Sequence, residues 1–238
     1  MRRRSLWFTL LILIVAVGVL CGTLGYFLKQ DPPYYTTNDD DENDPLVAAV
    51  VITRFGDLKN DIRSKGDWGA TFSAQELNAF LREHLSDGES LSDILPDNIH
   101  SPRVAIEGDR IKIAARWQSK LHESLSTVLS LELKVWLVNK QINTVAVEIV
   151  GVWAGGIPIG SQSWLDRISE AARESNVDVT WYRHDGHPVG VFRFYADQVV
   201  PTTQIRTIHV ADGKVTMAGR SLIDPGLPAS VDGRPPTP

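Results

Sequence analysis

The sequence predicts an α+β protein, in which an N-terminal transmembrane helix precedes one extracytoplasmic domain. Three observations predict this class: an uncharged apolar segment near the N-terminus, three segments of helical period, and a long stretch in which the apolar period is two. Period-two segments separated by short turns are typical of antiparallel strands. We therefore expect a curved, mostly antiparallel sheet of about seven strands with two or three flanking helices.

The apolar segment, residues 6–28, contains no charged residue and is long enough to be a transmembrane helix. As a helix it would extend about 35 Å, whereas a bilayer core is roughly 30 Å thick. A cleaved signal peptide is the main alternative, although the segment exceeds the roughly 7–15 residues of a typical signal core. A lipoprotein anchored at Cys21 is less favoured, because Leu20 stands where such a signal has a small residue.

The charges on either side of this segment predict its orientation. Arg2, Arg3 and Arg4 precede it, and an acidic run at 39–44 follows it. Positive charge favours the cytoplasmic side of a membrane, so the N-terminus is expected inside and the remaining chain outside. The expected organisation is a cytoplasmic N-terminus (1–5), a transmembrane helix (6–28), an acidic proline-containing stalk (29–44), an extracytoplasmic domain (45–222) and a disordered proline-rich tail (223–238).

Cysteine content and charge exclude several classes of function. Cys21 is the only cysteine and lies in the apolar segment, so the domain has neither a disulfide nor a thiol centre. Residues 1–30 hold four of the 24 Lys and Arg and none of the 29 Asp and Glu, which leaves a net charge of −9 on the remainder. Such a surface repels nucleic acid, and no nucleic-acid partner is expected.

Three helices are expected, over about residues 45–65, 73–86 and 162–174. The second has the strongest start signal, because Ser73 and Glu76 have the spacing of a capping box. We expect this helix to lie on the sheet.

The strands are expected from residue 103 onward, with hairpin turns at Gly108–Asp109, Asp185–Gly186 and Asp212–Gly213. The segment 126–138 places its leucines on one face, and three helices are too few to cover a face of this length. The sequence therefore leaves two alternatives, a fully closed core and a groove that remains open on this face. The candidate groove residues are Leu129, Leu131, Leu133, Val135, Trp153, Trp164 and Leu165.

The glycine-rich segment GGIPIGS (155–161) is interpreted as a joint between a strand and a helix. It lacks the lysine that a phosphate-binding loop requires. Gly155 and Gly156 are expected to interrupt the strand ladder, and Ser161 or Ser163 is expected to cap the helix.

No catalytic residue, metal site or cofactor is expected. The chain contains neither a G-x-S-x-G nor an H-E-x-x-H motif. His184 and His187 flank a turn, but no third metal ligand is identifiable. We therefore do not expect an enzyme.

Two segments, FSAQELNAFL (72–81) and GGIPIGSQSWLDRI (155–168), resemble motifs of the YpmS-like family of single-pass bacterial envelope proteins. The family's T-x-x-Q-L-N-x-L motif is spread by one residue here, and Pro158 falls earlier than in the second motif. The resemblance covers about residues 70–200. It implies a location in the bacterial inner membrane and a β-rich domain distantly similar to tubular lipid-binding modules, and it transfers no catalytic residue.

Two functions are compatible with these features. The first is a membrane-anchored extracytoplasmic binding module that holds a lipid or another apolar ligand in a groove of its curved sheet. The alternative is an envelope scaffold or protein-interaction domain, with a closed core, no small-molecule ligand and an envelope protein as its partner.

Overall fold

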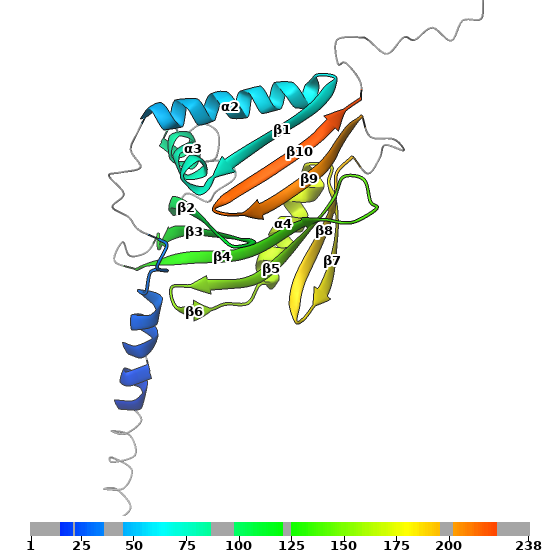
Figure 1. The fold of residues 1–238 in the computed structure, drawn as a ribbon. Helices are drawn as coiled ribbons and strands as arrows, with labels where there is room; N and C mark the ends of the chain where they lie inside the picture. Colours follow the sequence, from blue (N-terminus) through cyan, green and yellow to red (C-terminus); the bar gives the residue numbers. More distant parts are fainter. Residues whose placement is uncertain are drawn as a thin grey trace, which may run out of the picture.

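Two antiparallel sheets and three helices form the body of the protein (Figure 1). The structure is a computed structural model, which describes residues 15–20, 22–35, 45–86, 98–120, 125–195 and 202–222. The small sheet has the strand order β1-β10-β9, with β1 (Gly66–Ser73), β9 (Thr203–Ala211) and β10 (Lys214–Ser221). The helices are α2 (Pro45–Arg63), α3 (Ala74–Ser86) and α4 (Gln162–Glu174).

The large sheet has seven strands in the order β2-β3-β4-β5-β8-β7, and the short β6 pairs with β5. Its strands are β2 (Ile99–Glu107), β3 (Arg110–Gln118), β4 (Ser126–Leu137), β5 (Thr144–Ala154), β6 (Ile157–Pro158), β7 (Asp178–His184) and β8 (His187–Arg193). All of its pairs are antiparallel. The α+β class and a large antiparallel sheet of seven strands are thereby confirmed.

The sequence does not predict the division into two sheets. β1 was not expected as a strand, because Gly66 and Gly69 interrupt its apolar pattern. Its buried side chains, Trp68 and Phe72, are four residues apart and lie on one face, as strand geometry requires. β1 pairs with β10, from the far end of the chain, and so builds the small sheet from both ends of the domain.

The three helices form where the sequence predicts them. The capping box of α3 is present: the Ser73 amide donates to Glu76 Oε2 at 2.8 Å, and the Glu76 amide donates to Ser73 Oγ at 3.2 Å. At α4 the expectation of a serine cap is only half met. Ser161 occupies the N-cap position but its side chain makes no cap hydrogen bond, and the side chain of Ser163 lies outside the described residues.

Each sheet has its own apolar core. Val51, Leu58, Trp68 and Phe72 are buried between α2 and the small sheet. Figure 1 shows α2 lying along this sheet, with α3 beside it. On the large sheet, α4 packs through Leu165 on residues of β4 and β5.

Two buried asparagines join the small sheet and its helix α3 to the large sheet. Asn78 of α3 donates to the Val104 carbonyl of β2 at 2.9 Å and accepts from the Val104 amide at 2.6 Å. Asn143, just before β5, donates to the Thr203 carbonyl at 2.7 Å and accepts from the Ile205 amide of β9 at 2.7 Å. Each side chain thus replaces a strand partner, and together the two fix the small layer on the large sheet.

The N-terminal segment is helical over residues 15–20 and 22–28. Within the described ranges no helix is both long enough and apolar enough to cross a membrane. The first part of the predicted transmembrane helix, the predicted cytoplasmic N-terminus, most of the predicted stalk and the predicted tail lie outside the described residues.

Residues 29–35, the start of the predicted stalk, pack against the large sheet. Tyr35 is buried in a cluster with Ala114 and Val128, and its hydroxyl donates to the Ser101 carbonyl at 3.1 Å. Asp31 forms an ion pair with Arg116 at 2.7 Å. Burial raises the pKa of the Tyr35 hydroxyl, which stays neutral. We call residues 29–35 the strap.

Candidate functional site

The seven predicted groove residues do not come together in one groove. Four of them, Leu131, Leu133, Trp164 and Leu165, meet in a packed cluster around Ile149 and Val152, which α4 covers. Leu129 and Val135 are half-buried on β4. The ring of Trp153 lies over Gly151 and lines a hollow beneath the strap, together with Tyr34 and Gly155.

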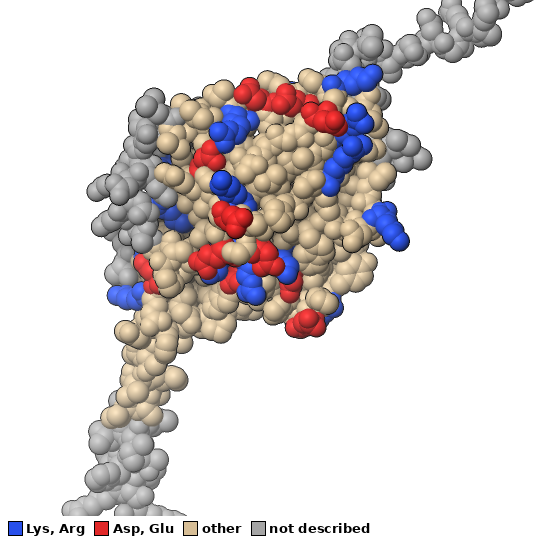
Figure 2. All heavy atoms as spheres, in the orientation of Figure 1, with Lys and Arg blue, Asp and Glu red and all other residues tan. Residues whose placement is uncertain are grey.

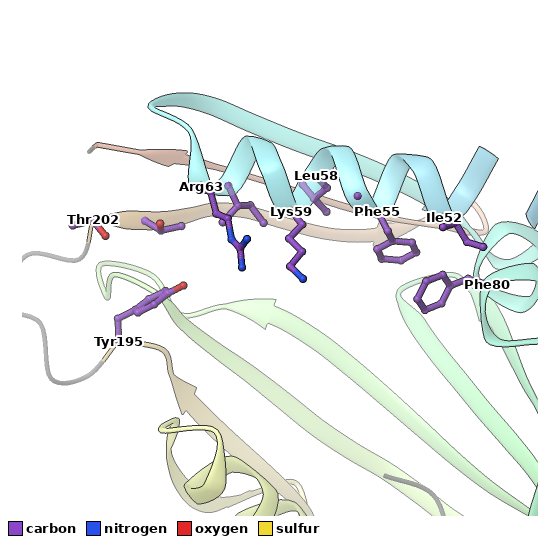
Figure 3. A pocket seen from close by; sticks show the side chains of 11 residues that line it. Ile52, Phe55, Leu58, Lys59, Arg63, Phe80, Tyr195 and Thr202 are labelled. Carbon is purple, nitrogen blue, oxygen red and sulfur yellow. The ribbon is translucent and has the colours of Figure 1, made fainter. Parts of the chain in front are cut away.

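A larger cleft lies along α2, with a volume of about 740 Å³, which is within the usual range of ligand pockets. It is lined by Ile52, Phe55, Gly56, Leu58, Lys59, Ile62, Arg63, Phe80, Tyr195, Thr202 and Thr203. Figure 3 shows α2 and the start of β9 above the cleft, Phe80 at one end and Tyr195 below the other end. We call this hollow the α2 cleft.

The α2 cleft exists because α2 carries two apolar stripes. Val51 and Leu58, seven residues apart, face the small sheet and are buried. Ile52, Phe55 and Ile62 form the second stripe, and Ile52 is 38% exposed. Phe55 and Ile62 are half-buried beside the first stripe, so Ile52 is its most exposed member, and the three together give the cleft an apolar wall that a ligand could cover.

Aromatic rings make one end of the α2 cleft rigid. Phe55 stacks on Phe72 of β1, with ring centroids 4.2 Å apart, and contacts Phe80 of α3 at 4.4 Å. Stacked rings of this kind add stability beyond that of their buried area. The packing of Phe55 on Phe72 and Phe80 therefore fixes the position of the apolar wall of the cleft.

Lys59 and Arg63 are the charged side chains of the α2 cleft, and both are exposed. No acidic side chain is found among the described residues that line it. Asp57 and Asp61 lie on the other flank of α2, where they border a separate shallow hollow. Both acids of α2 therefore lie away from the cleft, on the same flank as Arg54.

Tyr195 stands at the mouth of the α2 cleft in an unusual backbone conformation. Its φ is 58°, in the left-handed region that bulky residues rarely adopt, and 41% of its surface is exposed. The amide of Phe194 donates to the Asn143 carbonyl at 3.0 Å, which fixes the residue before it. A bulky residue keeps such a conformation only where the surrounding structure fixes it.

The sequence did not identify Ile52, Lys59, Arg63 or Tyr195 as site residues. The helical spacing of Ile52, Phe55, Lys59 and Ile62 is a signal that could have shown the second stripe. Which stripe stays uncovered depends on where the large sheet lies, and spacing within α2 carries no information on that.

His184 and His187 lie directly opposite each other in the β7–β8 hairpin, as the sequence predicts. Nδ1 of His187 is 2.8 Å from Glu148 Oε1, whereas His184 is 3.5 Å from Asp185. Among the described residues no three metal-ligating side chains cluster closely enough to hold an ion.

Gly155 and Gly156 form the contact between the large sheet and the end of the N-terminal helix. The Gly156 amide donates to the Phe27 carbonyl at 2.7 Å, and Thr127 Oγ1 donates to the Leu28 carbonyl at 2.6 Å. A Cβ at Gly155 would lie 2.5 Å from both of these carbonyl oxygens. The glycine pair therefore permits close approach of another backbone, in addition to ending β5.

Charge on the face shown in Figure 2 is mixed, with acidic and basic side chains next to each other. Lys134 and Asp109 are paired at 2.6 Å, and Arg110 and Glu132 at 2.5 Å. Over the described residues this face carries no extended patch of one sign.

The YpmS-like resemblance stays a prediction, because comparison with protein-family models, with curated proteins and with solved structures finds no match to this chain.

Proposed function

We propose that the protein is a membrane-anchored, extracytoplasmic module that binds an apolar ligand in the α2 cleft. The observation that carries the proposal is the open apolar stripe of Ile52, Phe55 and Ile62, which faces a hollow of about 740 Å³. Exposure of such a surface to water is unfavourable. A hydrocarbon chain placed on it would remove apolar surface from water, which contributes roughly 25 cal/mol of favourable free energy per Å² buried. The site differs from the groove expected from the sequence, which centres on β4.

The membrane anchor in this proposal rests on the sequence. Residues 6–28 are apolar and uncharged, and three arginines precede them. A protease added to intact spheroplasts should remove the domain and spare the N-terminus. Protection of the domain in spheroplasts would contradict the proposed orientation.

The α2 cleft can be filled by a single substitution in α2. Gly56 lines the cleft, and a Cβ added there would have no heavy atom within 4 Å. In Gly56→Leu the new side chain would occupy the cleft, and the helix would gain stability because glycine is a poor helix former. A ligand site in the cleft would be blocked in a protein that remains folded.

The experiment compares three full-length proteins in nanodiscs of neutral phosphatidylcholine: the wild type, Gly56→Leu and Gly56→Ala. A long-chain alcohol with a diazirine group is the photolabel, and mass spectrometry maps the label on α2. We expect labelling of α2 in the wild type and in Gly56→Ala, and a loss of about tenfold in Gly56→Leu, equivalent to about 1.4 kcal/mol. Equal labelling of all three variants would contradict the proposal.

The second candidate function is a protein-interaction domain, and the outer edge of β7 favours it. β7 is the last strand of the large sheet, and Tyr182 on it is 59% exposed. An open strand edge can pair with a strand of another protein. A photocrosslinker at position 182 should then trap one defined envelope protein in cells, and the absence of any crosslinked species would exclude this function.

A further inference from the structure

We infer that the ligand of the α2 cleft is an anionic amphiphile with one hydrocarbon chain, whose head group lies between Lys59 and Arg63. The chain would extend along α2 toward Ile52 and Phe80. This inference rests on the proposed function, because it names the class of ligand for the same cleft.

Polarity changes along the α2 cleft from one end to the other. Ile52, Phe55 and Phe80 form an end without charge. One and two turns further along α2, Lys59 and Arg63 add two cations beside the apolar Ile62. From residue 52 to residue 63 the helix rises about 16 Å. A ligand that matches this wall has an apolar chain of comparable length and a charged head at one end only.

The sign of the head group follows from the two cations. Lys59 and Arg63 are four residues apart on one face of α2, and like charges at this spacing destabilise a helix. Neither has an ion-pair partner within the described ranges. An anion placed between them would remove this repulsion and accept charge-assisted hydrogen bonds from both.

The opposite side of the α2 cleft offers neutral hydrogen-bonding groups. Figure 3 shows Lys59 and Arg63 reaching down from α2 and Tyr195 facing them from below. Tyr195 lines this end and carries a hydroxyl that can donate to an oxyanion, whereas the Thr203 hydroxyl is already hydrogen-bonded to Ser221 Oγ at 3.4 Å. A zwitterionic or cationic head group would place positive charge next to two cations, so the cleft disfavours it.

The experiment uses the full chain in nanodiscs of neutral phosphatidylcholine and three photolabels of equal chain length. Each label carries a diazirine on the chain, and the head groups are a carboxylate, a phosphate monoester and a neutral alcohol. Mass spectrometry measures the label on α2 and Phe80. We expect at least one anion to label this site about tenfold more than the alcohol, and the stronger of the two anions identifies the head group.

The variant Lys59→Gln/Arg63→Gln tests the role of the cations. It should reduce labelling by the anions to the level of the alcohol and leave labelling by the alcohol unchanged. The matched control is Lys214→Gln, because Lys214 is an exposed lysine in the small sheet that does not line the α2 cleft. This control should behave as the wild type.

The outcomes separate the two proposals. Equal labelling of α2 by all three probes, or unchanged anion labelling in the double variant, would overturn the anionic head group and leave the apolar site in place. Absence of labelling of α2 by every probe would overturn the proposed function as well.

Discussion

The amide of Gly156 donates a 2.7 Å hydrogen bond to the carbonyl oxygen of Phe27, so the end of the N-terminal helix is fixed to the large sheet. The strap continues this contact through the Asp31–Arg116 ion pair and buried Tyr35. A chain that leaves the N-terminal helix and binds the large sheet directly cannot act as a flexible linker. The domain is therefore held in one orientation relative to the N-terminal helix.

Gly155→Ala should detach the strap. Gly155 has a φ of 58°, and a Cβ there would meet the backbone carbonyls of Phe27 and Leu28 at 2.5 Å. Backbone atoms cannot move away as a flexible side chain can, so we expect a loss of about 1–3 kcal/mol in the free energy of unfolding. Trypsin should also cleave after Lys29 faster than in the wild type.

The control for this substitution is Gly160→Ala. Gly160 lies in the same segment, but a Cβ there has no heavy atom within 4 Å. It should leave both unfolding and cleavage after Lys29 unchanged. If Gly155→Ala matched this control, the docked strap would not contribute to stability.

The role of this glycine pair shows what a sequence can and cannot predict. The strand before it and the helix after it are local features, because apolar period and composition specify them within a dozen residues. The contact between Phe27 and Gly156 joins segments that are far apart in the chain. The sequence of a glycine pair does not show whether the pair ends a strand or allows another backbone to approach.

The two sheets illustrate the same limit. Hairpins such as β2–β3 and β9–β10 were predicted from alternation and turn residues. β1 was missed because its pairing with β10 is non-local and its two glycines weaken the alternation. The α2 cleft depends on that small sheet, so its position could not be predicted without β1.

Asn143 should be among the most sensitive polar residues of the domain. It is fully buried, and its side chain bonds the Thr203 carbonyl and the Ile205 amide, both at 2.7 Å. Asn143→Gly keeps the φ of 53° accessible but leaves these groups without partners. Buried groups without partners cost about 1–3 kcal/mol each, so we expect a lower midpoint in urea unfolding.

A second substitution separates the backbone from the side chain. Asn143→Ala should lose about 1 kcal/mol more than Asn143→Gly, because alanine disfavours a positive φ. Lys140 has a φ of 66° and is exposed, so the difference in stability between Lys140→Ala and Lys140→Gly measures the cost of the backbone conformation alone. Wild-type stability of Asn143→Gly would show that the two sheets do not depend on this residue.

Leu165→Ala tests whether the face of β4 beneath α4 is a closed core or the groove expected from the sequence. Leu165 is 8% exposed and packs with Ile149 and Val152. In a closed core the cavity left by the missing atoms costs about 2–5 kcal/mol in the free energy of unfolding. Truncation of a side chain that lines an open groove lowers the free energy of unfolding much less. A loss below about 1 kcal/mol, measured by thermal unfolding, would therefore favour the groove.

The capping box of α3 should make stability depend on pH through Glu76. Burial alone would raise the pKa of this carboxyl, but hydrogen bonds from Ser73 and the ion pair with Arg54 outweigh it and lower the pKa below 4.5. A carboxyl with a lowered pKa contributes its full stabilisation above pH 4.5, and this contribution is lost as the pH falls through the lowered value.

Glu76→Gln should therefore be less stable than the wild type by about 1 kcal/mol at pH 7, and the difference should vanish well below pH 4.5. Urea unfolding followed by circular dichroism at several pH values measures it. Glu170→Gln is the matched control, because Glu170 pairs with Arg173 on the exposed face of α4 and such pairs contribute little. A difference between Glu76→Gln and the wild type that stayed the same at every pH would mean that the charge of Glu76 does not support α3.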